Sequence, residues 1–316
     1  MMRRTSWLAV LAGAALTLSA CAGDDALDAD GTGDTATSGG EETIVVGGAN
    51  FTEMQIMQAM YVALLEDAGF TTETVSADNR ELYFPELADG AIDVVPEYAA
   101  TLAEFLNLGA NGPGAEPIAT NDAVETVEAM RPLAREQGVI LLEPAQAADQ
   151  NGFAVTVEFA EENDLQTLSD LGELDQPIVL AATEECPERP FCAPGLEETY
   201  GIEISDVLPT GFGSPQTKAA VTAGDAQLGL VATTDGRLAE DGLVLLEDDK
   251  RLQLADNLVP AVNEDAASDA LVDALNRLAD ELTTEDLVEL NRQVDAERQQ
   301  ASDVARAWLE DKGLIG

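Results

Sequence analysis

Cys21 is the residue whose position most directly predicts a chemical modification. It follows an apolar segment that begins after Arg3 and Arg4 and ends in Leu-Ser-Ala. A basic start, a short apolar centre and small residues are typical of a secretory signal, and the order Leu-Ser-Ala-Cys is that of a bacterial lipobox, in which the cysteine is acylated. We expect residues 1–20 to be a lipoprotein signal peptide and a lipid on Cys21 to anchor the chain to the outer face of the cell membrane. An ordinary secretory signal with a cysteine by chance is the alternative.

The chain is strongly acidic, with 61 Asp and Glu residues, 15 Lys and Arg residues and a formal net charge of −46. Residues 21–42 contain no basic residue and many Asp, Gly and Thr residues, which predicts a flexible tether. The charge argues against nucleic-acid binding. It also suggests a saline exterior, because salt screens the repulsion between like charges. A very soluble, acid-rich exported protein is the simpler alternative.

Cys186 and Cys192 are separated by five residues, Pro-Glu-Arg-Pro-Phe. In an exported protein this pair predicts a disulfide, which would close a short loop. A metal site is the competing interpretation. Two cysteines in a chain without histidine would leave zinc without its usual ligands, so we favour the disulfide.

The sequence contains no histidine, which excludes Ser-His-Asp and Cys-His catalytic pairs and His-ligated zinc. Neither a nucleophile-elbow motif nor a phosphate-loop motif occurs. Catalysis by two carboxylates remains formally possible, but acidic residues are so numerous that no pair is informative. We therefore expect a binding protein that uses no metal or cofactor, and not an enzyme.

Short apolar segments alternate with helical segments from residue 43 onward. The predicted strands are 44–47, 72–76, 92–95, 139–142, 153–157, 178–181, 227–232 and 244–246, and the predicted helices include 53–68, 122–137 and most of 265–312. This alternation predicts the α/β class, with parallel sheets that are covered on both faces. Ligands of such sheets bind at the carboxyl ends of the strands.

The loop after the first predicted strand ends in Thr52, and Gln55 follows three residues later. This spacing predicts a capping box at the start of the next helix. Free backbone N–H groups there would favour an anion such as a carboxylate. A cap without any ligand is the alternative.

Four motifs in the chain resemble those of a known family. They are Val-Gly-Gly-Ala-Asn-Phe-Thr-Glu at 46–53, Gly-Ala-Ile-Asp-Val-Val-Pro-Glu-Tyr at 90–98, Thr-Thr-Asp-Gly-Arg at 233–237 and Val-Leu-Leu-Glu-Asp-Asp-Lys at 244–250. Their order and sequence resemble the substrate-binding proteins of osmoprotectant ABC importers, which bind glycine betaine, choline and carnitine. The resemblance implies a monomer that captures a small molecule and delivers it to an ABC permease.

The resemblance also implies a two-lobed type II periplasmic-binding-protein fold with two strands that cross between the lobes. Segments 150–155 and 257–262 are the expected crossings. Lobe 1 would comprise residues 43–149 and 256–316, and lobe 2 residues 150–255. Hinged closure of the lobes around the ligand is the expected motion.

A quaternary ammonium group has no hydrogen to donate and is held by aromatic faces. Aromatic residues form only 4% of the chain, so those near predicted cleft loops are informative. The resemblance implies that Tyr98, in a loop after Pro96, and Phe153, at the first crossing, belong to an aromatic cage. The predicted ligand-binding residues are Asn50, Phe51, Thr52, Arg80, Tyr98, Phe153, Phe212, Thr234 and Asp235. Core packing is the alternative for Phe51, and capping of a helix near residue 236 is the alternative for Thr234 and Asp235.

Two positions depart from the family pattern. Ala232 lies where relatives often have a tyrosine, and Ala49 lies where many have a lysine. The cage would lack one wall, and Arg80 or the helix start at Thr52 would have to hold a ligand carboxylate. A receptor of the same fold for an amino acid or another polar amine is therefore the main alternative, and a structural adhesin on a lipid tether is a further one.

Overall fold

The computed structural model describes residues 43–174 and 176–316. The signal peptide predicted at 1–20, the lipid on Cys21 and the tether predicted at 21–42 lie outside the described residues. Among the helices of the described part, none combines the length and apolar composition that a membrane span requires.

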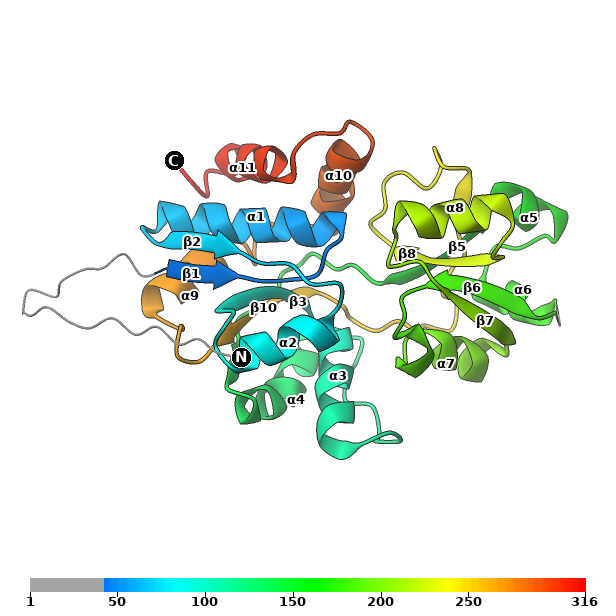
Figure 1. The fold of residues 1–316 in the computed structure, drawn as a ribbon, viewed down its shortest axis with the longest axis horizontal. Helices are drawn as coiled ribbons and strands as arrows, with labels where there is room; N and C mark the ends of the chain where they lie inside the picture. Colours follow the sequence, from blue (N-terminus) through cyan, green and yellow to red (C-terminus); the bar gives the residue numbers. More distant parts are fainter. Residues whose placement is uncertain (1–42, 175) are drawn as a thin grey trace, which may run out of the picture. The chain divides into compact units, whose positions relative to one another are not determined.

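Two five-stranded sheets form the framework (Figure 1). The first sheet has the strand order β2-β1-β3-β10-β4, and the second has the order β7-β6-β8-β5-β9. The strands are β1 (Thr43–Val46), β2 (Thr71–Thr74), β3 (Val94–Tyr98), β4 (Val139–Leu141), β5 (Asn151–Thr156), β6 (Ile178–Ala182), β7 (Ile204–Pro209), β8 (Leu228–Ala232), β9 (Leu243–Leu245) and β10 (Leu258–Asn263).

The α/β class is confirmed and each sheet contains the expected parallel pairs, but two strands run in the opposite direction. Strand β10 runs antiparallel to β3 and β4, and β5 runs antiparallel to β8 and β9. These two strands carry the chain directly from one sheet to the other, without a crossover helix that would return it in a parallel direction. The connecting segments pair at an antiparallel bridge between Ala148 and Asn257.

Helices cover both faces of each sheet (Figure 1). In the first sheet, α1 packs with α9, α10 and α11 on one face, while α2, α3 and α4 lie on the other. In the second sheet, α8 covers one face, and α6 and η2 cover the other. The helices are α1 (Thr52–Asp67), α2 (Arg80–Ala88), α3 (Ala99–Asn111), α4 (Ala123–Glu136), α5 (Val157–Glu162), α6 (Leu168–Glu173), η1 (Cys186–Glu188), α7 (Ala193–Gly195), η2 (Leu196–Tyr200), α8 (Pro215–Ala223), α9 (Asp269–Asn276), α10 (Thr284–Asp295) and α11 (Ala301–Asp311).

Helix α1 begins differently from the prediction. Its N-cap is Phe51, without a side-chain cap, so the predicted capping box of Thr52 and Gln55 is wrong. Thr52 is already helical, and its hydroxyl donates a hydrogen bond of 2.7 Å to the carboxylate of Asp295 on α10. A carboxylate of the protein itself therefore lies at the helix start that we expected to attract an anion.

Strand β3 extends farther than predicted and includes Tyr98. Pro96 indicated a loop, because proline is rare inside sheets. In the structure Pro96 lies on β3 opposite Pro260 of β10, and every residue of β3 is buried. Tyr98 is the last strand residue and the N-cap of α3, so its ring projects from a rigid junction.

Candidate ligand-binding site

A cavity of about 90 Å³ lies between residues from the two sheets and the segments that connect them. From the first sheet and its helices come Phe51, Arg80, Tyr83 and Tyr98, and from the second come Asn151, Glu185, Arg189 and Phe212; Asp149, Gln150 and Asp256 come from the connecting segments. This is small compared with the roughly 300–1,000 Å³ of pockets for drug-sized ligands. A solute of few heavy atoms matches it best.

Three aromatic rings form a continuous wall of this cavity. The ring centroids of Phe51 and Tyr98 are 6.4 Å apart, with an angle of 28° between the planes. Those of Phe51 and Phe212 are 5.1 Å apart at 66°, an edge-to-face arrangement. Phe212 reaches this position from the loop between β7 and α8, where the positive φ of 95° at Gly211 makes the turn possible. All three aromatic residues were predicted from the sequence as ligand-binding residues.

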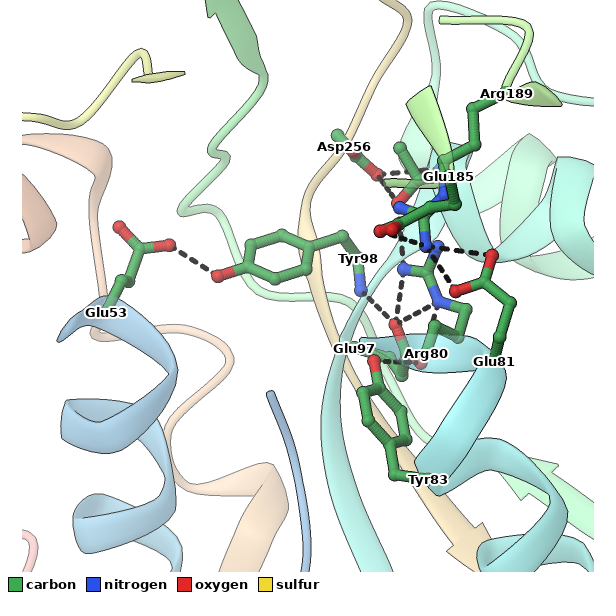
Figure 2. A network of polar contacts seen from close by, with 10 residues as sticks. Glu53, Arg80, Glu81, Tyr83, Glu97, Tyr98, Glu185, Arg189 and Asp256 are labelled. Carbon is green, nitrogen blue, oxygen red and sulfur yellow. Dashed lines mark hydrogen bonds and ion pairs between the residues drawn. The ribbon is translucent and has the colours of Figure 1, made fainter. Parts of the chain in front are cut away.

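The hydroxyl of Tyr98 is fixed by Glu53, and Figure 2 shows the ring pointing toward that carboxylate. Glu53 lies in the first turn of α1 and is only 2% exposed. Its second oxygen accepts hydrogen bonds from Thr234 at 2.6 Å and from Asn291 at 2.8 Å. Burial raises the pKa of Glu53, against the opposing effect of these three hydrogen bonds. The network holds the Tyr98 ring in one orientation.

Arg80 lies at the cavity but is engaged by the protein. Its Nε and Nη2 atoms donate to the carboxylate of Glu97 at 2.6–3.1 Å, and Nη2 also donates to Thr101. Tyr83 donates to the same carboxylate at 2.9 Å (Figure 2). Both members of the ion pair are buried, and Glu97 outweighs the effect of burial and raises the pKa of Arg80. Only Nη1 of Arg80 has no hydrogen-bond partner among the described residues.

Asp149 and Asp256 are cavity residues that the sequence analysis missed. They lie side by side on the two connecting segments, where the backbone N–H of Asp149 donates to the carbonyl of Asp256 at 3.2 Å. Burial raises the pKa of Asp149 well above its usual range and that of Asp256 to about 7. One signal was available in the sequence: each acid stands at the boundary of a segment predicted to cross between lobes.

At the rim of the cavity, residues that follow the second sheet's strand β6 contact a helix of the first sheet. Arg189, next to the disulfide that joins Cys186 and Cys192, donates to both oxygens of Glu81 on α2 at 2.8 and 3.0 Å. It also pairs with Glu185 at 3.2 Å, as Figure 2 shows. These contacts bring the loop after β6 against the start of α2.

Several predicted site residues lie elsewhere. Phe153 is 1% exposed and does not line the aromatic cavity, because its side chain belongs to the core cluster of the second sheet, together with Leu180 and Leu230. Asn50 and Thr52 line a neighbouring cavity of about 440 Å³ beside Lys218 and Arg237. The expectation of a shared wall formed by Tyr98 and Phe153 is therefore not met.

Thr234 and Asp235 do not cap a helix, because residues 233–242 form turns. Thr234 is fully buried and donates a hydrogen bond to Glu53. It therefore supports the residue that holds Tyr98 and does not lie at the cavity surface. Asp235 pairs with Lys218 and accepts the backbone N–H of Arg237 at 3.0 Å. Among the described residues, no cluster of acidic, Cys or His side chains has an arrangement that could hold a metal ion.

A family model, related sequences and a solved structure all indicate the same kind of protein. Residues 42–311 match the family described as the substrate binding domain of ABC-type glycine betaine transport system. The chain is 27% identical to a glycine-betaine-binding protein of Pseudomonas aeruginosa over 87% of this chain and 89% of that protein, and 26% identical to the glycine betaine-binding protein YehZ of Escherichia coli over 85% and 90%. A crystal structure of a glycine betaine/carnitine/choline ABC transporter protein matches with a TM-score of 0.64 and 20% identity, covering 86% of this chain and all of that one. The two-sheet architecture is thus the predicted type II periplasmic-binding-protein fold.

Proposed function

Because this chain belongs to the family of substrate-binding domains of ABC-type glycine betaine transport systems, we propose that it captures a quaternary-ammonium solute outside the cytoplasm and delivers it to an ABC permease. The solute is of the glycine betaine, choline or carnitine type. The names of the two relatives with 27% and 26% identity support this class of ligand. The protein acts as a monomeric receptor and catalyses no reaction.

The aromatic wall of Phe51, Tyr98 and Phe212 is the observation that carries this proposal. A methylated ammonium group is attracted to the negative face of an aromatic ring by roughly 0.5–2 kcal/mol per ring, and more strongly where water is excluded. Three rings at one small cavity, in a chain with only 4% aromatic residues, provide such a surface. The carboxyl groups of Asp149 and Asp256 line the same cavity and attract a cation when they are ionised.

Capture proceeds by closure of two lobes about the connecting segments. Residues 43–149 with 256–316 form one lobe, and residues 150–255 form the other. The paired backbone at Asp149 and Asp256 is the hinge, and the Arg189–Glu81 ion pair joins the lobes at the rim of the cavity. This division is supported by the sheet membership of the strands, since β1–β4 and β10 form one sheet and β5–β9 the other.

The receptor is held at the outer face of the cell membrane by a lipid on Cys21. The proposal rests on the order Leu-Ser-Ala-Cys after an apolar segment. Expression of the full chain in a bacterium with radiolabelled palmitate tests it. Label should enter the wild-type protein and be lost in Cys21→Ser, and equal labelling of both would contradict it.

A polar amine or an amino acid is the second candidate ligand. The specific observation in its favour is that the Asp149 and Asp256 carboxyl groups offer hydrogen-bond acceptors that a quaternary ammonium group cannot use. Calorimetric titration of the purified protein with choline, glycine betaine, carnitine, proline betaine and a set of amino acids separates the two. Binding restricted to quaternary compounds supports the first proposal, and binding restricted to amino acids overturns it.

A further inference from the structure

Among the described residues, Asp149 and Asp256 each accept hydrogen bonds through only one carboxyl oxygen. Oδ1 of Asp149 accepts from the hydroxyl of Thr233 at 2.9 Å and from the backbone N–H of Thr234 at 3.1 Å. Oδ1 of Asp256 accepts from the backbone N–H and the hydroxyl of Thr101 at 3.0 and 3.3 Å. For both residues, Oδ2 has no hydrogen-bond partner among the described residues, although the side chains are only 3% and 5% exposed.

Both aspartates are among the residues that line the cavity. A carboxyl group on a side chain that is almost entirely buried is costly to ionise unless a donor or a cation compensates it, so two such groups on one cavity point to a ligand that supplies the donor or the charge. Neither arginine at the cavity donates a hydrogen bond to these carboxyl groups among the described residues. Arg80 is held by Glu97, and Arg189 is held by Glu81 and Glu185.

We propose that Asp149 and Asp256 select the ligand by its net charge: the cavity prefers a cation that carries a hydrogen-bond donor, such as a choline-type amino alcohol, over a zwitterion that carries a carboxylate. This inference rests on the proposed function and specifies the ligand within it. The aromatic wall recognises the methylated nitrogen in both classes of compound. The two aspartates then distinguish the ligands by their second group. A ligand hydroxyl donates a hydrogen bond to Oδ2, whereas a ligand carboxylate is repelled by the ionised aspartates.

Because Asp149 and Asp256 can be protonated, the preference for a cation over a zwitterion should depend on pH. Ionised aspartates attract the cation, whereas protonated aspartates would donate a hydrogen bond to a zwitterion's carboxylate. Since burial raises the pKa of Asp256 to about 7 and that of Asp149 well above its usual range, cation binding must release protons near neutral pH. Affinity for the cation therefore rises with pH, and affinity for the zwitterion falls. The other charged or titratable groups around the pair are Glu53, Asp78, Arg80, Glu97, Tyr98, Glu185 and Arg189.

The test is calorimetric titration with choline chloride and with glycine betaine at about pH 5.5, 7 and 8.5, values that span the titration of Asp256. The wild-type protein should show a ratio of choline affinity to betaine affinity that rises by about tenfold across this range. Asp256→Asn and Asp149→Asn should each lower choline affinity by about tenfold and flatten the pH dependence. The amide oxygen of asparagine preserves the acceptor for Thr101 or Thr234, so both variants should fold, which thermal melting checks.

Asp311→Asn is the matched control, because it removes one negative charge at an exposed position on α11 outside the cavity. It should leave both affinities unchanged. Stronger binding of betaine than choline at high pH, or affinity ratios that neither cavity variant alters, would overturn the inference while leaving quaternary-ammonium capture intact.

If no quaternary compound binds, the proposed function fails, and ethanolamine and glycine then repeat the comparison of cation with zwitterion. A preference for ethanolamine that rises with pH and is lost in Asp256→Asn supports charge selection. Equal or better binding of glycine, or no binding of either compound, overturns it.

Discussion

The hydroxyl of Tyr98 donates a hydrogen bond of 2.7 Å to the carboxylate of Glu53, and this contact joins the aromatic wall to a buried polar network (Figure 2). Glu53 also accepts from Thr234, in the turn after β8, and from Asn291 on α10. Four segments far apart in the sequence therefore determine the orientation of one ring. An aromatic ring held in this way would need no ordering when a ligand arrives, which favours affinity.

Removal of the Tyr98 hydroxyl should destabilise the protein more than it weakens ligand binding. Tyr98→Phe leaves one oxygen of Glu53 without its donor, at a cost of about 1–3 kcal/mol in the free energy of unfolding. The ring remains in place, so the affinity for a quaternary ammonium should fall less than about fivefold. Tyr61→Phe is the control, because Tyr61 is also buried and its hydroxyl makes no hydrogen bond within the described residues. Denaturant unfolding measures both variants, and equal loss of stability in the two would contradict the role assigned to Glu53.

Loss of the Phe51 ring should weaken binding of a quaternary ammonium. Phe51→Ala removes the ring that touches both other aromatic residues of the wall, and we expect an affinity loss of about 3- to 30-fold. Phe153→Leu tests the alternative, drawn from the sequence, that Phe153 contacts the ligand. Since Phe153 lies in the core, its substitution should lower thermal stability and leave affinity within about twofold. A larger affinity loss for Phe153→Leu than for Phe51→Ala, measured by calorimetry, would reverse the assignment.

The raised pKa of Asp256 predicts that this residue makes the protein less stable as pH increases. The folded state binds this proton up to about pH 7, whereas the unfolded chain releases it near its usual value of about 4. The contribution to stability is therefore fully present below about pH 4 and is lost as pH rises through about 7. Asp256→Asn has no carboxyl group at this position and should not lose this stability as pH rises. Relative to the wild type, the variant should gain up to about 1.4 kcal/mol per pH unit in this window.

Urea unfolding of both proteins at several pH values between about 4 and 8 measures that difference, without ligand present. A constant difference across the window would show that Asp256 titrates at its ordinary value in the folded protein.

The ion pair between Arg189 and Glu81 should slow ligand release. Both residues are partly exposed, so the pair contributes about 0.2–1 kcal/mol, and Arg189→Gln should raise the dissociation rate about 1.5- to 5-fold. Arg131→Gln is the control, because Arg131 pairs with Glu128 and Glu143 and donates to the carbonyl of Leu141, all on the side of the first sheet and away from the rim. Stopped-flow displacement measures the rates. No acceleration in Arg189→Gln, or the same acceleration in Arg131→Gln, would exclude a role for the rim contact in closure.

Salt should stabilise this protein more than it stabilises most proteins. With a net charge of −46 and only 15 basic residues, the folded chain repels itself, and screening relieves the repulsion. We expect the thermal midpoint to rise steadily from about 0.1 to 2 M sodium chloride, with most of the gain at the lower concentrations where the Debye length changes most. A midpoint that stays flat or falls would remove the idea of adaptation to a saline exterior.

The sequence predicts the framework well because periodicity and glycine positions are local signals. The apolar face of α1, the helical character of the C-terminal segment and most strands follow directly from it. Strand β7 was missed because it lies at the sheet edge and is largely exposed, so it lacks an apolar run. The direction of β5 and β10 was also missed, since strand direction depends on how two distant segments pair, as Ala148 and Asn257 do.

The candidate site was predicted only in part, for a similar reason. Phe51, Tyr98 and Phe212 were recognised because aromatic residues on loops are rare in this chain. Asp149 and Asp256 were missed because acidic residues are abundant, and only their burial distinguishes them from the solvated majority. Phe153 was placed in the cage by resemblance, yet the alternation of side chains along β5 puts it in the core.

A crystal structure of the protein with a bound quaternary-ammonium solute would show directly whether the aromatic wall holds the ligand. We expect the ligand nitrogen within about 6 Å of the ring centroids of Phe51, Tyr98 and Phe212, with Asp149 and Asp256 on the same cavity. A ligand located instead in the neighbouring cavity beside Lys218 and Arg237, or on the outer surface, would contradict it.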